Sequence, residues 1–259
     1  MDLGIRGKKA IVCASSQGLG FACARSLSRE GVSVFINGRD IKRLEKATSI
    51  IEEETGLQVI PVVADLNETR GRKKLFDACP EPDILVNNNG GPSPGKFSEW
   101  SDDDWRDALE ANLVVPIILL RTVLPGMRRR KFGRIVNITS SQVKSPLPLM
   151  GLSTAARNGL TAVCKSISKE AISDNVTINN LLPERIDTER QMLMARFVAK
   201  SSGISVEEAR TLQVDGVAAK RMGTLNEFGD ACAYFCSEQA GYMSGQNLQL
   251  DGGSYSGVF

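Results

Sequence analysis

The chain has 259 residues, a mass of 28.0 kDa, 42% hydrophobic residues and a formal net charge of +2. This size and composition fit one large α/β domain, and the small net charge argues against nucleic acid as the main partner. The chain contains no histidine, which excludes Ser-His and Cys-His hydrolase mechanisms and removes the commonest metal ligand. We therefore expect no metal site, and a small-molecule substrate as the partner.

No segment of the sequence predicts secretion or membrane insertion. The charged pair Lys8-Lys9 precedes an apolar run too short for a signal peptide, and the run Leu113 to Leu120 is too short to cross a bilayer. Six cysteines fall within predicted strands and helices without a metal-type Cys-x-x-Cys spacing: Cys13, Cys23, Cys79, Cys164, Cys232 and Cys236. We expect reduced core cysteines, a cytoplasmic protein and no membrane partner.

The first predicted elements are a strand over Lys9 to Cys13, a Gly-rich turn over Ala14 to Gly20, and an amphipathic helix ending near Glu30. Glycines in the turn let the backbone approach a ligand, and the first N–H groups of the helix have no intrahelical partners. The turn therefore fits a pyrophosphate, although a plain strand-to-helix turn is the alternative. A second strand, Val32 to Asn37, follows at βαβ distance and favours the pyrophosphate.

Further apolar runs predict five more buried strands, at 57–63, 83–86, 134–138, 176–182 and 247–250. Helical stretches separate most of them, so the chain predicts an α/β fold with a doubly wound, seven-stranded parallel sheet in one domain, 1–259. Two irregular parts, 91–95 and about 184–223, follow the carboxyl ends of strands, where an open α/β sheet binds ligands. We expect the second, the lid segment, to cover a ligand.

Several motifs, in order and spacing, give the chain a resemblance over nearly its whole length to the short-chain dehydrogenase/reductase family, close to its 3-oxoacyl-carrier-protein reductase branch. CASSQGLG resembles T-G-x-x-x-G-x-G, Asn87 to Gly90 resembles N-N-A-G, and NNLLPERIDT resembles N-x-x-x-P-G-x-x-x-T. Asn112 and Ser140 are found at the family's active-site Asn and Ser, and Asp65-Leu66 at its adenine-contacting Asp. The resemblance implies a Rossmann-type fold and hydride transfer with a nicotinamide cofactor.

The chain departs from this family at the catalytic signature Y-x-x-x-K. Ser153 replaces the tyrosine and Arg157 the lysine, in a register fixed by Gly159-Leu160. Serine is a far poorer acid than a phenol, and arginine stays protonated, so it stabilises charge without relaying a proton. The resemblance then implies that Ser140 holds a substrate oxygen, Asn112 organises water, and Arg157 binds ribose hydroxyls and favours an oxyanion. The chain resembles a subgroup with an imperfect catalytic motif.

Arg39 follows Gly38 at the end of the second strand, where an NAD-selective member would carry a carboxylate. An arginine there suits the 2′-phosphate of NADP(H), although a solvated arginine stacked on adenine is the alternative. We expect NADP(H) to be preferred and NAD(H) to be possible. The predicted cofactor-binding residues are Ser15, Ser16, Gly18, Leu19, Gly20, Arg39, Asp65, Leu66, Asn88, Gly90, Arg157, Pro183, Ile186 and Thr188.

Asp65 is predicted to contact the adenine, and Thr188 the pyrophosphate or carboxamide end of the cofactor. A helix N-cap is the plainer interpretation of each residue, and it is compatible with the functional one. Tyr255, in a tail that can reach a neighbouring subunit, is a minor candidate for the missing acid.

Two functions follow from these observations. The first is an NADP-dependent oxidoreductase that interconverts a carbonyl and an alcohol, with Ser-x-x-x-Arg in place of Tyr-x-x-x-Lys. The alternative is a non-catalytic dinucleotide-binding sensor, scaffold or oligomer subunit.

Helices around 101–128 and 152–173 are apolar over more than one face, and the family usually pairs such helices across a two-fold axis. We expect a homotetramer.

Overall fold

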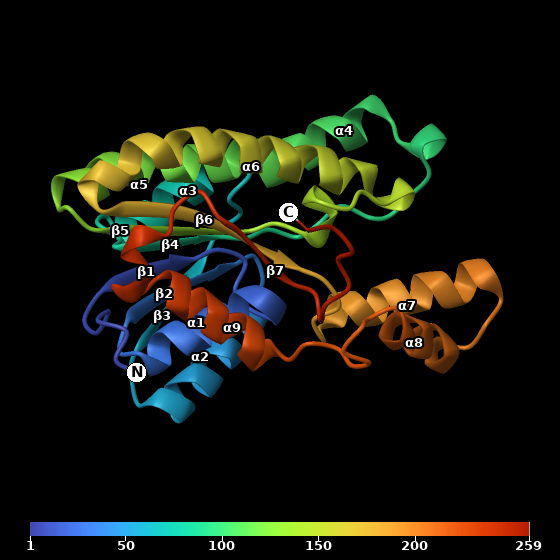
Figure 1. Cartoon of the computed structure of the whole chain (residues 1–259). Helices are drawn as coiled ribbons and strands as arrows, with labels where there is room; N and C mark the ends of the chain where they lie inside the picture. The colour runs from blue at the N-terminus through green and yellow to red at the C-terminus, as the bar shows by residue number, and fades with distance from the viewer. Residues whose placement is uncertain (259) are drawn as a thin grey trace.

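The seven strands form one parallel sheet in the order β3-β2-β1-β4-β5-β6-β7 (Figure 1). The structure is a computed structural model and describes residues 1–258. The strands are β1 (Lys9–Val12), β2 (Ser33–Gly38), β3 (Val59–Val63), β4 (Ile84–Asn87), β5 (Gly133–Ile138), β6 (Val176–Pro183) and β7 (Asn247–Leu250). The predicted fold is therefore confirmed. Strand order reverses between β1 and β4, which places the topological switch point there.

Helices cover both faces of the sheet (Figure 1). One face carries α1 (Gly18–Arg29), α2 (Ile41–Thr55) and α9 (Leu225–Phe235); the other carries α3 (Thr69–Ala78), α5 (Val115–Arg129) and α6 (Gly151–Ala171). Each interlayer has its own apolar core, built around Leu27 and Phe228 on the first face and around Leu75, Leu119 and Leu160 on the second. Removal of these side chains from water is the main driving force for the layered arrangement.

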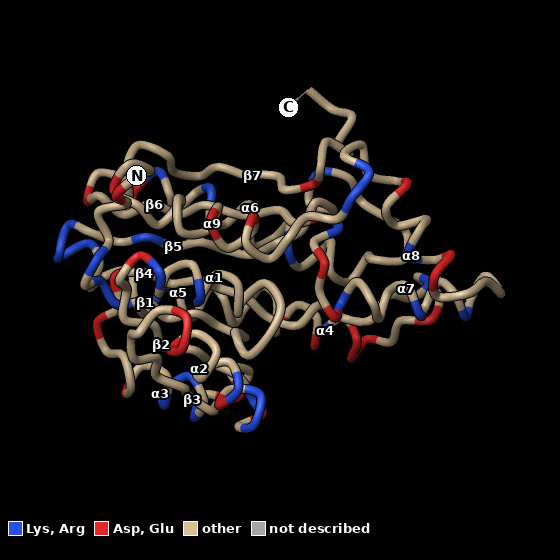
Figure 2. The backbone as a smooth tube through the Cα atoms, turned by 90° about the horizontal axis from the view of Figure 1, so that it is seen from below, with Lys and Arg blue, Asp and Glu red and all other residues tan. Residues whose placement is uncertain are grey.

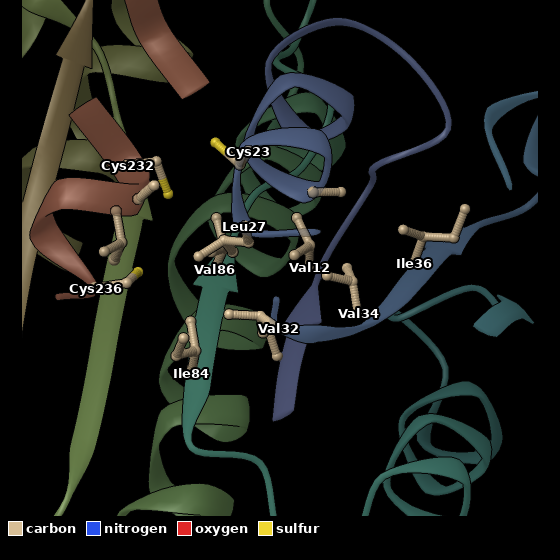
Figure 3. Close-up of a cluster of buried hydrophobic side chains, with 14 of the residues drawn as sticks. Val12, Cys23, Leu27, Val32, Val34, Ile36, Ile84, Val86, Cys232 and Cys236 are labelled. Atoms are coloured by element: carbon tan, nitrogen blue, oxygen red, sulfur yellow. The ribbon is translucent and has the colours of Figure 1, made fainter. Parts of the chain in front are cut away.

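The six cysteines are free and buried, as the sequence predicts. Cys23 of α1 and Cys232 and Cys236 of α9 belong to the apolar core between these helices and the sheet (Figure 3). Burial raises the pKa of the Cys13 thiol to about 12, so the reactive thiolate is scarce near neutral pH.

A long helical rod crosses the second face of the sheet. It contains α4 (Asp102–Leu109), the π-helical turn η2 (Glu110–Val114) and α5, and Ser101 caps it by accepting a hydrogen bond from the backbone N–H of Asp104 at 3.2 Å. By length and composition alone this rod could cross a membrane, whereas its apolar run alone predicts a segment too short to do so. In the fold, buried residues of α5 pack against the sheet, as in the core helix of a layered α/β domain.

A row of asparagine amides crosses four strands of the sheet. Asn87, Asn137, Asn180 and Asn247 are successive register partners on β4, β5, β6 and β7. Each Nδ2 donates to the Oδ1 of the next residue, at 2.9 Å, 2.9 Å and 2.8 Å. The three bonds point the same way across the sheet, and such aligned bonds strengthen one another.

The lid segment contains two helices, α7 (Glu189–Ser202) and α8 (Val206–Asp215), which extend away from the sheet (Figure 1). They pack on each other through a small core of Ala195, Ala199 and Ala209. Basic and acidic residues are interspersed along most of the backbone, including both lid helices (Figure 2). The lid therefore has only a small apolar core of its own.

Candidate active site

The main cavity has a volume of about 780 Å³ and lies at the carboxyl ends of the central strands, between the sheet and the lid segment. Its wall is built from the β1–α1 turn, the segments that follow β2 to β6, the start of α6, and α7. This volume is within the range of small-molecule and cofactor sites. The cavity opens at the switch point of the sheet, where the topology predicts a ligand.

The Gly-rich turn forms one end of the cavity. α1 begins at Gly18, which has a left-handed φ of 60°, and the capping residue Gln17 makes no side-chain hydrogen bond to the helix. The first N–H groups of α1 are therefore available to an anion, and the helix dipole favours one there. Ala14, at the family's first glycine, adopts a φ of 45°, so the turn keeps the glycine conformation despite the substitution. These features fit the pyrophosphate of a dinucleotide.

The structure brings most of the predicted site residues to the wall of this one cavity, although they are far apart in the sequence. Their individual contacts with a ligand stay predictions. The residues on the wall are Ser16, Gly18, Leu19, Arg39, Asp65, Leu66, Asn88, Gly90, Ser140, Ser153, Arg157, Pro183, Ile186 and Thr188.

Ser15 and Gly20 are not part of the cavity wall. Ser15 is fully buried: its Oγ donates to the carbonyl of Val12 at 2.6 Å and accepts from the backbone N–H of Asn37 at 3.0 Å. Its side chain therefore ties the turn to β2, and the prediction that it contacts a cofactor is corrected. A Cβ on Gly20 would lie 2.4 Å from the carbonyl oxygen of Ala14, so this glycine allows the turn to fold back on itself.

Asn112 lies in the π-helical turn and is not part of the main cavity wall, so its catalytic role stays a prediction. It is 3% exposed, its Nδ2 donates to the carbonyl of Ala108 at 3.4 Å, and it borders a second hollow next to Gly90. A π-helical turn widens the helix and frees carbonyl groups. Asn89, where the family has alanine, donates to the carbonyl of Ala111 in this turn at 3.0 Å.

Ser140 lies two residues beyond β5 and faces the main cavity. It caps the short helix η3 (Ser141–Val143), since its Oγ accepts a hydrogen bond from the backbone N–H of Gln142 at 3.3 Å. A hydroxyl that accepts this bond still has its own hydrogen to donate. Ser140 can therefore donate to an oxygen atom in the cavity.

Arg157 is held firmly in the cavity wall. It is 8% exposed, and it donates from Nε to the Ser153 hydroxyl at 3.1 Å and from Nη1 to the carbonyl of Ile138 at 2.6 Å. Burial, together with the nearby charge of Arg190, lowers the pKa of Arg157 to about 10. The guanidinium thus stays charged at neutral pH. Ser153, at the family's tyrosine position, orients this group.

Two basic residues lie at the opposite end of the cavity. Arg39 is 77% exposed at its side chain, and its Nη1 is 3.7 Å from Oδ2 of Asp65. Arg43, also on the wall, donates from Nη1 to Oε1 of Gln17 at 2.8 Å. Arg43 is not among the predicted residues; its place in the first turn of the helix that follows β2 is the signal that could have indicated it.

The two N-cap interpretations have different outcomes. Thr188 caps α7, since it accepts from the backbone N–H of Gln191 at 3.4 Å, which confirms the plainer interpretation. Asp65 does not cap α3, because that helix starts at Thr69 after the N-cap Glu68. Its carboxylate instead accepts from the backbone N–H of Asn67 at 3.0 Å, which closes a local turn.

Two further charged residues on the cavity wall were not predicted. Glu184 is found where the family has glycine after Pro183, and burial raises the pKa of its carboxyl. Arg190 of α7 donates from Nη2 to the carbonyl of Pro92 at 2.7 Å, which joins the lid to the loop after β4. The departure from glycine could have indicated Glu184. No motif indicates Arg190, because its position depends on how the lid packs.

Comparison with known proteins agrees with this geometry. A family model described as enoyl-(acyl carrier protein) reductase matches residues 13–255. The chain belongs to the short-chain dehydrogenase/reductase family. It is 30% identical over 264 aligned positions to an uncharacterized oxidoreductase, YvaG, of Bacillus subtilis, covering 100% of both chains. It is 29% identical to the NADPH-dependent reductase BacG of the same organism, covering 97% of this chain and 99% of BacG.

A solved structure of L-sorbose reductase from Gluconobacter frateurii, complexed with NADPH and L-sorbose, has a TM-score of 0.93 to this chain at 28% identity, covering 100% of both. As a short-chain dehydrogenase/reductase, the chain is thus an oxidoreductase by family. It differs from the family pattern in having no tyrosine on the main cavity wall within residues 1–258. Tyr255, the minor candidate acid, instead lies beside Lys144, whose Nζ is 5.2 Å from the ring centroid.

Proposed function

We propose that this short-chain dehydrogenase/reductase binds NADP(H) and interconverts a carbonyl and an alcohol, with Ser140 and Arg157 as its catalytic residues. The observation that carries the proposal is the single cavity whose wall contains the Gly-rich turn, the Ser140 hydroxyl and the buried guanidinium of Arg157. When bound, the nicotinamide cofactor supplies the hydride. Its pyrophosphate would be held by the N-terminus of α1 and by Thr188, next to Gly18, Leu19 and Ser16.

The chain's own groups stabilise the charge that develops on the substrate oxygen. The Ser140 hydroxyl donates a hydrogen bond to that oxygen, and the fixed charge of Arg157 lowers the energy of the oxyanion in a cavity of low polarity. Ser153 positions the guanidinium of Arg157, since its hydroxyl accepts a hydrogen bond from Arg157 Nε. With no phenol on the wall, a water molecule in the cavity supplies the proton.

The cofactor preference rests on the basic end of the cavity. Arg39 and Arg43 both line it beside Ser16, and no carboxylate replaces Gly38 at the end of β2. Guanidinium groups bind phosphate oxygens with strong, paired hydrogen bonds, whereas a ribose hydroxyl needs an acceptor. NADPH-dependent relatives support the same choice.

Replacing Arg39 with alanine is expected to weaken NADPH binding about 10- to 100-fold, the usual worth of a hydrogen bond to a charged group, and to leave NADH binding nearly unchanged. Fluorescence titration of both cofactors measures this. Arg70→Ala, at an exposed arginine off the cavity wall, is the matched control. An unchanged ratio of the two affinities in the Arg39 variant contradicts the 2′-phosphate contact.

A non-catalytic dinucleotide-binding protein is the second candidate, favoured by one observation: the position of the family's tyrosine is a serine that bonds to Arg157. One experiment separates the two functions. NADPH binding is first established by titration. Oxidation of NADPH is then followed by the loss of its absorbance in the presence of a panel of ketones, aldehydes and 3-oxoacyl thioesters. Tight binding with no oxidation across the panel would support the sensor or oligomer subunit.

We also propose a homotetramer. Val114 at the start of α5 and Val163 on α6 are exposed, as are Tyr242 and Leu248 near the carboxyl-terminal edge of the sheet. Light scattering is expected to give about four times the 28.0 kDa mass of the chain, and Val163→Glu to give a smaller species, because a charge is costly in an apolar interface. A 28.0 kDa species at micromolar concentration for the unmodified protein contradicts this.

A further inference from the structure

Two arginines from different elements meet inside the main cavity. Arg157 comes from α6 and Arg190 from the lid helix α7. A Cβ built on Gly91 would lie 3.8 Å from Nη2 of Arg157 and 3.8 Å from Nη2 of Arg190, so the two guanidinium groups border the same point. This point lies next to Gly90 and on the same cavity wall as Ser140 and Ser153.

Neither guanidinium has an acidic partner among residues 1–258. Within residues 1–258, Arg157 donates only to Ser153 and Ile138, and Arg190 only to Pro92, and none of these acceptors is a carboxylate. The pKa of Arg157 is lowered by burial and then by Arg190, and that of Arg190 by burial. Among the described residues, Nη2 of Arg157 and both Nε and Nη1 of Arg190 make no hydrogen bond, so these groups are available to a ligand.

Arg157 is buried and Arg190 is half-buried, and two like charges side by side without a counter-charge are costly. An anion between them removes this cost, and a planar carboxylate matches the donor geometry of guanidinium groups. The cavity wall also has apolar side chains from the loop before α6 and from α7, namely Leu147, Leu149, Leu193, Met194 and Val198, among polar ones such as Gln142 and Gln213. The site therefore combines a place for a small oxyanion with a place for a hydrocarbon chain.

We propose that Arg157 and Arg190 bind a carboxylate of the substrate, which makes the substrate an oxo acid, or the matching hydroxy acid, with an apolar chain. This inference rests on the proposed function and specifies its substrate class. A cofactor phosphate would present the same oxyanion chemistry. The carboxylate is favoured because Arg157 is fixed beside Ser153 at the reacting end, whereas the open N–H groups that suit a pyrophosphate belong to α1. Because Arg190 belongs to α7, a bound acid would contact the lid as well as α6.

Binding of 2-oxo and 4-oxo acids of increasing chain length, each compared with its methyl ester, tests the proposal. The affinities are measured by calorimetry on the protein saturated with NADP⁺, which cannot reduce an oxo acid, and on two variants, Arg190→Gln and the control Arg196→Gln, at an exposed arginine of the same helix. The best acid is expected to bind about 10- to 100-fold more tightly than its ester. Arg190→Gln should remove this difference, while Arg196→Gln keeps it and both keep the NADPH affinity.

Equal binding of acids and esters across the series would overturn the proposal. So would an Arg190→Gln protein that binds NADPH more weakly yet keeps its preference for acids, because the pair would then serve the cofactor phosphates. Since binding is read without turnover, the outcome is separate from that of the proposed function. A protein that prefers acids through Arg190 but never oxidises NADPH would keep the carboxylate site and lose the reductase.

Discussion

Replacing Ser140 with alanine is expected to lower kcat for carbonyl reduction about 100-fold or more, the usual loss when one positioned oxyanion donor is removed. The Ser140 Oγ already accepts a hydrogen bond from the backbone N–H of Gln142, so the hydroxyl hydrogen is free to be donated. Because Ser140 lines the cavity, a substrate oxygen there can accept it. A hydrogen bond that strengthens as negative charge develops lowers kcat when lost and has little effect on KM. Steady-state kinetics with NADPH and the best carbonyl of the panel measure both.

Ser145→Ala is the control for this variant, because Ser145 is exposed on the same loop and does not line the main cavity. It should retain the kcat of the unmodified protein. If Ser140→Ala instead raised KM alone, the serine would bind substrate and transition state equally, and its proposed role in stabilising the oxyanion would be lost.

Restoring the family's residues, Ser153→Tyr with Arg157→Lys, is expected to raise kcat about 100-fold, near the lower end of what a positioned general acid contributes. The phenol would provide the proton donor that the cavity wall lacks, and the neighbouring ammonium would lower its pKa. Ser153 lines the cavity, so a larger side chain there can extend into open space. Stopped-flow measurement of NADPH oxidation separates this chemical step from product release.

The single variants are the controls for the pair. Arg157→Lys alone should be less active than the unmodified protein, because lysine cannot bond to both Ser153 and the Ile138 carbonyl with the geometry of arginine. Ser153→Tyr alone removes the acceptor for Arg157 Nε. If the double variant binds NADPH normally but gains no activity, the supply of a proton is not what limits the reaction.

The sheet was predictable because its strands are short, nearly continuous runs of β-branched and apolar residues that alternate with helical stretches. This pattern is typical of a parallel sheet whose two faces are both covered by helices. The cavity followed from topology, since parallel strands end at the same edge. Arg39, Asp65, Ser140 and Pro183 share one wall because each follows the end of a strand or closes it, although the family resemblance, and not this topology, indicated Asp65, Ser140 and Pro183.

The differences between the predicted and the observed site have physical causes. A serine such as Ser15 can bond to the nearby backbone or to a ligand, and the sequence does not tell which. Asn112 depends on a π-helical turn, whose widening has no pattern in the sequence. Arg190 reaches the cavity only through the packing of the lid, so its pairing with Arg157 is a tertiary property.

The row of asparagines described above also sets the alignment of the active-site groups. Strands buried on both faces have no alternating pattern to oppose a shift by one residue, so apolar burial alone specifies their pairing weakly. A shift of β5 would break the bonds of Asn137 to both Asn87 and Asn180, and each polar group left unpaired costs about 1–3 kcal/mol.

Ser140 follows Asn137 by three residues, and Pro183 follows Asn180 by three. A slip of one residue would carry either of them about 3.3 Å along its strand, enough to separate a donor from the oxygen it must reach. The asparagine amides thus fix the register of β5 and β6. They hold Ser140 and Pro183 at constant positions relative to the middle of the sheet, although the amides do not line the main cavity.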